Sequence, residues 1–118
     1  LDGQWARAKG FDTSCPLGPW LVTEFDGSDR LVVTRLDGEV VQEGRTADLV
    51  YGVAELVAHA SAAFTLLPGD VILTGTPDGL VGVHEGDEVV TEIDGVGSLS
   101  NTIVGETPIT YASGSRSG

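Results

Sequence analysis

Two short stretches of this sequence place polar groups where they could bind the oxygen atoms of a small acidic ligand. The first is Gly75-Thr76-Pro77, which follows the apolar run Val71 to Thr74. Gly75 lets the backbone approach a ligand closely, and Pro77 removes a donor and stiffens the exit. Thr76 then offers both a hydroxyl and a backbone N–H at the mouth of a strand, a common position for binding groups. A strand-to-loop turn with no ligand explains the same residues equally well.

The second stretch surrounds Lys9, the only lysine in the chain. Its ammonium group is followed by Gly10, the aromatic ring of Phe11 and the hydroxyl of Thr13, which together form a plausible set of ligand-facing groups. Taken alone, a solvent-exposed lysine is the simpler interpretation. Two prolines and two glycines between residues 7 and 20 predict an extended segment or loop and no helix.

The elements that must position these stretches are mostly β. Asp37-Gly38 separates the β-prone runs 31–36 and 39–42 and predicts a two-residue hairpin. A second hairpin is expected from residues 88–93 and 98–104, around Asp94-Gly95-Val96-Gly97. Apolar residues at helical spacing predict one amphipathic helix over 53–65. Pro68-Gly69-Asp70 should then lead into a short buried strand, Val71 to Thr74. The predicted fold class is mostly β with one main helix (α+β).

Length and charge limit the function classes. A chain of 118 residues is one domain or part of one, and it can bury a real core without disulfides. The net charge of −12 argues against nucleic acid or an anionic membrane as partners, because both need clustered positive charge. A single cysteine, Cys15, and the absence of a membrane-length apolar run or a leader pattern suggest a cytoplasmic protein. The chain contains no methionine and opens at Leu1, so it looks like a piece of something longer.

No metal or nucleotide motif stands out. There is no phosphate-loop pattern, no Gly-x-Ser-x-Gly elbow and no zinc-type spacing of histidines or cysteines. His59 lies in the predicted helix with only Glu55 at a suitable spacing, which favours a structural or solvent role. His84, near Glu85 and Asp87, could form a metal clasp, but an exposed loop is favoured. No metal ligand is assigned in this chain.

The two stretches together resemble the fumarylacetoacetate hydrolase family. Lys9-Gly10-Phe11-Asp12-Thr13 with Cys15-Pro16-Leu17-Gly18-Pro19-Trp20 is similar to the segment that follows the metal site in that family. Asp37-Gly38-Glu39 through Gln42, with Gly44 and Thr46, resembles its "NGE…Q…G.T" hairpin. Residues 68–77 resemble its "PGD.I.TGTP" signature, and Gly86-Asp87, Gly95-Val96-Gly97, Leu99 and Asn101 fit its closing strands.

The resemblance implies a mixed β-sandwich roll, a homodimer and a metal-dependent enzyme. Family members use Mg²⁺ or Mn²⁺ to bind 2-oxo acids, and many cleave carbon–carbon bonds in β-diketo acids of the acylpyruvate or fumarylpyruvate type. Others are decarboxylases or isomerases. Lys9 matches a catalytic lysine that adds positive charge beside the substrate. Thr76, with Gly75, matches the position that binds the substrate carboxylate, and Thr13 matches a residue near the metal-site waters.

The family's carboxylate ligands, a Glu-x-Glu pair and two more, have no counterpart here and are expected upstream of this chain. We therefore expect residues 1–106 to be the C-terminal part of such a domain, residues 107–118 to be a flexible tail, and the chain alone to be inactive. The alternative is a non-catalytic β-rich binding or assembly module. Upstream sequence containing Glu-x-Glu would favour the enzyme, and a true start at Leu1 would favour the module.

Overall fold

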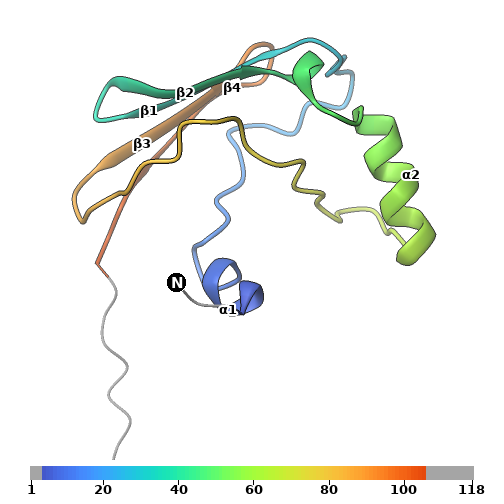
Figure 1. Cartoon of the computed structure of the whole chain (residues 1–118), viewed down its shortest axis with the longest axis horizontal. Helices are drawn as coiled ribbons and strands as arrows, with labels where there is room; N and C mark the ends of the chain where they lie inside the picture. Colours follow the sequence, from blue (N-terminus) through green and yellow to red (C-terminus); the bar gives the residue numbers. More distant parts are fainter. Residues whose placement is uncertain (1–3, 106–118) are drawn as a thin grey trace, which may run out of the picture.

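The computed structural model describes residues 4–105, and they form one antiparallel sheet with two helices beside it (Figure 1). The sheet has four strands in the order β2-β1-β3-β4. Its strands are β1 (Leu31–Leu36), β2 (Glu39–Arg45), β3 (Glu88–Ile93) and β4 (Gly97–Thr102). The helices are α1 (Trp5–Lys9) and α2 (Val53–Ala63), and a short 3-10 helix η1 (Thr46–Asp48) follows β2. The predicted class, α+β with mostly strands, is confirmed.

The first hairpin forms because its two turn residues accept a left-handed backbone. Asp37 has φ 50° and Gly38 has φ 88°, as a two-residue turn of this hand requires. The Asp37 carboxylate also accepts a hydrogen bond of 2.8 Å from the backbone N–H of Glu88. The turn therefore closes β1 onto β2 and at the same time holds the start of β3.

The second hairpin joins the first through β1. Strands β3 and β4 pair from Glu88↔Thr102 to Ile93↔Gly97, and β3 pairs with β1 from Val32↔Ile93 to Leu36↔Val89. Strand β1 is thus interior to the sheet, and its Val33 is the only buried hydrophobic residue among those described, at 7% exposed. Both predicted hairpins are confirmed, and β2 extends three residues further than expected, to Arg45.

Helix α2 begins after Gly52, where the Glu55 carboxylate accepts a 2.9 Å hydrogen bond from the Gly52 N–H. Such a bond satisfies one of the unpaired donors at a helix start. The helix ends at Ala63, two residues before the predicted end. Among residues 4–105 no helix is long and apolar enough to cross a membrane.

Two expectations about local structure were wrong. Helix α1 covers Trp5–Lys9, where no helix was predicted from residue 7 onward. The reason is that the helix breakers begin only at Gly10, directly after Lys9. The segment from Val71 to Thr74 is not a strand. Val71 is 56% exposed and Leu73 is 76% exposed, because no described strand pairs with this segment.

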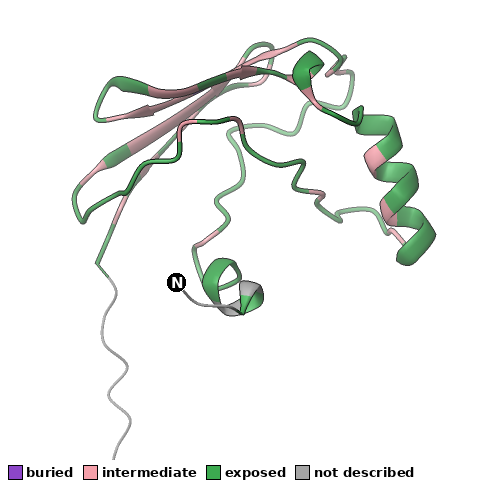
Figure 2. Ribbon diagram, in the orientation of Figure 1, coloured by how far each residue is buried: buried purple, intermediate pink, exposed green. Residues whose placement is uncertain are grey.

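The hydrophobic core formed by the described residues is also much smaller than predicted. Figure 2 shows intermediate burial along the sheet and exposed residues over α2 and most connecting segments. Large apolar side chains such as Trp20, Val50 and Phe64 are 71–89% exposed. Burying one side chain contributes only about 1.5–3 kcal/mol, which is far below the conformational entropy lost by a domain. The described residues therefore present apolar surface that they do not cover themselves.

Candidate ligand-binding site

The predicted loop around Thr76 lies against strand β2 and is held there by one side chain. The Nε2 atom of Gln42 donates a 3.1 Å hydrogen bond to the Thr76 hydroxyl and a 3.0 Å hydrogen bond to the Pro77 carbonyl. A primary amide has two N–H donors, so both bonds can form at once. Because the Pro77 carbonyl can only accept, the amide must present its nitrogen to the loop. Gln42 thus fixes the loop to the sheet.

Two glycines allow the loop to approach β2 this closely. A Cβ on Gly44 would lie 3.0 Å from the Cβ of Pro77, closer than side chains normally pack. Gly79 has φ 101°, and a Cβ there would overlap the carbonyl oxygen of Val41. The glycines lie on either side of the Gln42 contact, so the backbone of the loop follows β2 without a gap for side chains.

A cavity of about 520 Å³ opens beside this loop. Thr76 and Gly75 line it on one side, and η1, Leu49 and the start of α2 line it on the other. Its size falls within the range of small-molecule sites. Gly75 has φ 111°, a conformation that L side chains rarely adopt, and nothing lies within 4 Å of where its Cβ would be. The backbone at Gly75 is therefore uncovered on that side, and its contact with a ligand stays a prediction.

Two four-residue turns with the same hydrogen bonds, residues 67–70 and 84–87, flank the segment that contains the Thr76 loop. The Asp70 N–H donates to the Leu67 carbonyl (3.0 Å), and the Leu67 N–H donates to the Asp70 carboxylate (2.8 Å). His84 and Asp87 repeat both contacts at 3.2 and 2.7 Å. The third residue of each turn, Gly69 or Gly86, has positive φ. Such a turn requires glycine at that position.

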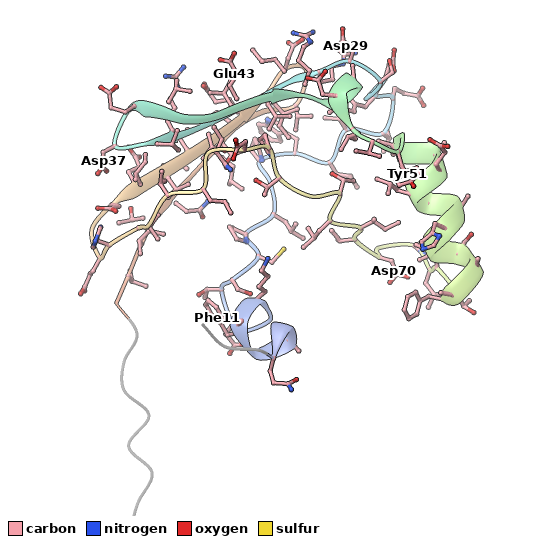
Figure 3. The ribbon with its side chains drawn as sticks, in the orientation of Figure 1. Phe11, Asp29, Asp37, Glu43, Tyr51 and Asp70 are labelled. Carbon is pink, nitrogen blue, oxygen red and sulfur yellow. The ribbon has the colours of Figure 1, made fainter. Side chains whose placement is uncertain are left out.

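The other predicted site residues lie in the N-terminal arm, the described residues 4–30 that precede β1. Lys9 is exposed at the end of α1, where its backbone carbonyl accepts a 3.0 Å hydrogen bond from the Ser14 hydroxyl. Thr13 is exposed in the following bend and has φ 68°. Neither residue lines the cavity beside Thr76. Figure 3 labels Phe11 in this arm, well apart from the sheet. The structure thus brings Gly75 and Thr76 together with Gln42, and it does not bring Lys9 or Thr13 to the cavity.

The described residues do not form a metal site. Within residues 4–105 no group of three or more histidine, cysteine, aspartate or glutamate side chains is placed to hold an ion. His84 is 87% exposed, and its Nδ1 lies 3.7 Å from the Asp87 carboxylate, which already closes the turn. The exposed-loop interpretation of His84 agrees with this geometry. His59 is exposed on α2. These donors do not fit a divalent cation.

An ion pair stands at the C-terminal end of β2. Arg45, at the end of the strand, donates a 2.6 Å hydrogen bond to the Asp29 carboxylate. This bond lowers the pKa of Asp29 below its usual value and raises the pKa of Arg45. The Nε–H of this guanidinium is thereby bonded to a carboxylate of the chain itself.

Comparison with known proteins decides the family. The model of the fumarylacetoacetate hydrolase C-terminal region matches residues 1–104. This chain belongs to the fumarylacetoacetate hydrolase family. The match covers the sheet, α2 and the Thr76 loop, and the matched model is that of the C-terminal region of fumarylacetoacetate hydrolase.

Curated relatives include proteins named as enzymes. The chain is 48% identical over 106 residues to Protein Rv2993c of Mycobacterium tuberculosis, covering 87% of this chain and 40% of the relative. It is 48% identical over 103 residues to the 4-hydroxyphenylacetate degradation bifunctional isomerase/decarboxylase of Salmonella dublin (85% and 24%). It is 44% identical over 111 residues to the human mitochondrial oxaloacetate tautomerase FAHD2A (86% and 35%). The chain thus spans well under half of the length of these relatives.

Solved structures share the fold. A 5-carboxymethyl-2-hydroxymuconate delta-isomerase from Mycobacterium smegmatis matches with a TM-score of 0.84 and 52% identity, covering 87% of this chain and 41% of that one. A maleylpyruvate hydrolase from Sphingobium sp. SYK-6, solved with manganese(II) and pyruvate, matches with a TM-score of 0.77 and 38% identity (80% and 37%). The predicted resemblance of the fold to this family is confirmed.

Sequence reasoning missed the role of Gln42. It noted the residue as part of a hairpin motif and assigned it no function. The available signal was a primary amide in a run of β-prone residues two positions before Gly44. That signal does not reveal the partner, because Thr76 is 34 residues away along the chain.

Proposed function

We propose that this chain forms the carboxylate-binding part of an enzyme that hydrolyses a carbon–carbon bond in a β-diketo acid of the acylpyruvate or fumarylpyruvate type. The observation that carries the proposal is the immobilised Gly75-Thr76 loop at the cavity. A loop with a positive-φ glycine and a fixed hydroxyl offers an N–H and an O–H to one carboxylate. A relative in this family has been solved with pyruvate, a small 2-oxo acid, which supports an acid ligand for such a loop.

The roles of the chain's own residues follow from this chemistry. The Thr76 hydroxyl and the backbone at Gly75 hold the carboxylate of the 2-oxo acid. Lys9 and Thr13 do not line the cavity among the described residues. For the complete polypeptide we propose that Lys9 supplies positive charge that stabilises the enolate formed when the bond breaks, and that Thr13 assists in binding. In the hydrolysis, water adds its oxygen to the acyl carbon, and the bond to the methylene carbon breaks. That carbon takes up a proton and becomes the methyl group of pyruvate.

A divalent cation belongs to this proposal, but its ligands do not lie among the described residues. The support for it is the relative solved with manganese(II) and pyruvate, of which this chain covers only 37%. We propose that the complete polypeptide binds Mg²⁺ or Mn²⁺ through carboxylates upstream of this chain. The 2-oxo acid would chelate such an ion, which would supply Lewis-acid chemistry at the acid's oxygens. The complete protein is further proposed to be a cytoplasmic homodimer, whereas this chain alone is inactive.

Isomerisation is the second candidate, and the names of several relatives favour it. The Mycobacterium smegmatis isomerase is 52% identical, and the human relative is named an oxaloacetate tautomerase. Both reactions pass through an enolate of the 2-oxo acid, which forms by C–C cleavage in the hydrolysis and by proton loss in the isomerisation, so the same loop would serve either one. The two differ in whether water attacks the neighbouring carbonyl.

The test uses the complete natural polypeptide with Mg²⁺ or Mn²⁺. Cleavage of acetylpyruvate should consume the absorbance of its enol form and produce one pyruvate per substrate. Oxaloacetate tautomerisation should be followed in parallel. Thr76→Val should raise KM for either substrate, and a chelator should abolish activity. Activity on oxaloacetate without any cleavage of acylpyruvates would favour the isomerase, and activity on neither would overturn the proposal.

A further inference from the structure

Among the described residues of strand β2, Gln42 is the one whose side chain donates hydrogen bonds to the proposed substrate loop. Resting on the proposed function, we infer that Gln42 is a positioning residue that sets the direction of the Thr76 hydroxyl proton. Gln42 does not line the cavity, so it would not itself contact the substrate. It acts by deciding which of the two hydrogen-bonding roles of Thr76 remains available to the ligand.

The hydrogen bonds of Gln42 leave the proton of the Thr76 hydroxyl available. The Gln42 amide donates to the Thr76 oxygen, and its other N–H is used by the Pro77 carbonyl. A hydroxyl that accepts a bond from one side keeps its own proton for another partner. The Thr76 proton is thus free to point into the cavity, where a carboxylate needs a donor. Without Gln42 the hydroxyl could rotate and present a lone pair instead.

The close packing of the loop against β2 holds Gln42 in place. Gly44 and Gly79 let the loop contact β2 on both sides of Gln42, so the amide stands between two points of close backbone approach. The bond to the Pro77 carbonyl holds the peptide that follows Thr76. Side chain and backbone of Thr76 are therefore oriented by one residue. A hydroxyl that accepts one hydrogen bond also donates a stronger one, because neighbouring hydrogen bonds polarise each other.

The experiment measures binding of oxalate, a small dicarboxylate that resembles the enolate of pyruvate, to the complete metal-loaded polypeptide by calorimetry. The variants are Thr76→Val, Gln42→Leu, the combination of both, and Gln42→Glu. Gln42→Glu keeps the shape but replaces the donor with a charged acceptor. Glu39→Gln, an exposed position at the other end of β2, is the matched control. Circular dichroism verifies that each variant is folded at the temperature of measurement.

Thr76→Val should weaken oxalate binding about tenfold to a hundredfold, the range expected for one hydrogen bond to a charged group. Gln42→Leu should weaken it by a similar factor, and the combined variant should be no weaker than Thr76→Val. Gln42→Glu should be weaker than Gln42→Leu, because its carboxylate takes the Thr76 proton and repels the ligand. Glu39→Gln should bind like the wild type. A residue that only stabilises the fold would not produce this order.

Each remaining result decides one of the two claims. Unchanged binding in Thr76→Val would overturn the proposed function, because the loop would not hold the carboxylate. Weaker binding in Thr76→Val with unchanged binding in Gln42→Leu would overturn the inference alone. The inference also fails if the two losses add in the combined variant. If Gln42→Leu does not fold, Gln42→Glu decides: binding equal to the wild type refutes the positioning role.

Discussion

Gly79 offers the sharpest test of how closely the loop approaches β2. Gly79 and Gly69 have nearly the same positive φ, 101° and 98°. A Cβ at Gly79 would overlap the Val41 carbonyl oxygen, whereas nothing lies within 4 Å of a Cβ at Gly69. Gly79→Ala and Gly69→Ala therefore share the cost of a strained backbone and differ in the contact with β2.

The difference between the two variants can be worked out from these contacts. Holding alanine at such a φ costs about 1–3 kcal/mol in either variant. In Gly79→Ala the loop must also move off β2, which breaks the two hydrogen bonds of Gln42. Each bond contributes about 0.5–1.5 kcal/mol to stability. Gly79→Ala should therefore lower the free energy of unfolding by about 1–3 kcal/mol more than Gly69→Ala does.

The assay is urea unfolding of the complete polypeptide and of both variants, followed by the midpoint and slope of each transition. Oxalate binding in folded samples supplies a second measurement. Gly79→Ala should weaken it because Thr76 is displaced, and Gly69→Ala should leave it near the wild-type value. Equal losses of unfolding free energy in the two variants would refute the close approach. Unchanged oxalate binding in Gly79→Ala would refute the link between this approach and Thr76.

Three more outcomes are expected. Asp37→Ala should cost about 1–2 kcal/mol of unfolding free energy, because it removes the acceptor of the Glu88 N–H and places alanine at a positive φ; Asp37→Asn, which keeps both properties, should be near neutral in the same urea assay. The pKa of Asp29 should lie below 3.8 by carboxyl NMR titration and return toward that value in Arg45→Met. Since the folded-state pKa is lowered, the stabilisation by this pair is present above the ordinary pKa and is lost as pH falls through the folded one; an unchanged titration would show that the ion pair does not form in solution. Lys9→Ala should reduce kcat about 10²–10³-fold with little change in unfolding midpoint, whereas a loss confined to KM would contradict its proposed role.

Local signals predicted the elements whose contacts are themselves local. Asp37-Gly38 predicted the first hairpin because a two-residue turn needs only its own backbone angles. The run from Val71 to Thr74 has the same apolar character but forms no strand, because a strand needs a partner that composition cannot supply. Its apolar residues predicted burial, and the described residues leave them exposed.

The site divides in the same way. The uncovered backbone at Gly75 and the hydroxyl of Thr76 could be predicted from the residues themselves. The Gln42 contact could not, because it depends on how β2 and a distant loop meet. The roles of Lys9 and Thr13 remain predictions, since both residues lie in the arm and outside the cavity lining.

The sheet order has a consequence for the order in which the chain folds. Each hairpin closes over a short turn, but β1 must find β3 across the long connection that carries α2 and the Thr76 loop. If Gln42 captures Thr76 first, the loop still to be closed is shorter by roughly a factor of four, which lowers its entropic cost by about 1 kcal/mol. The same clamp that would orient a substrate-binding hydroxyl should then also speed sheet assembly. Stopped-flow refolding should be several-fold slower in Gln42→Leu, and an unchanged refolding rate would show that the clamp forms only after β1 and β3 have paired.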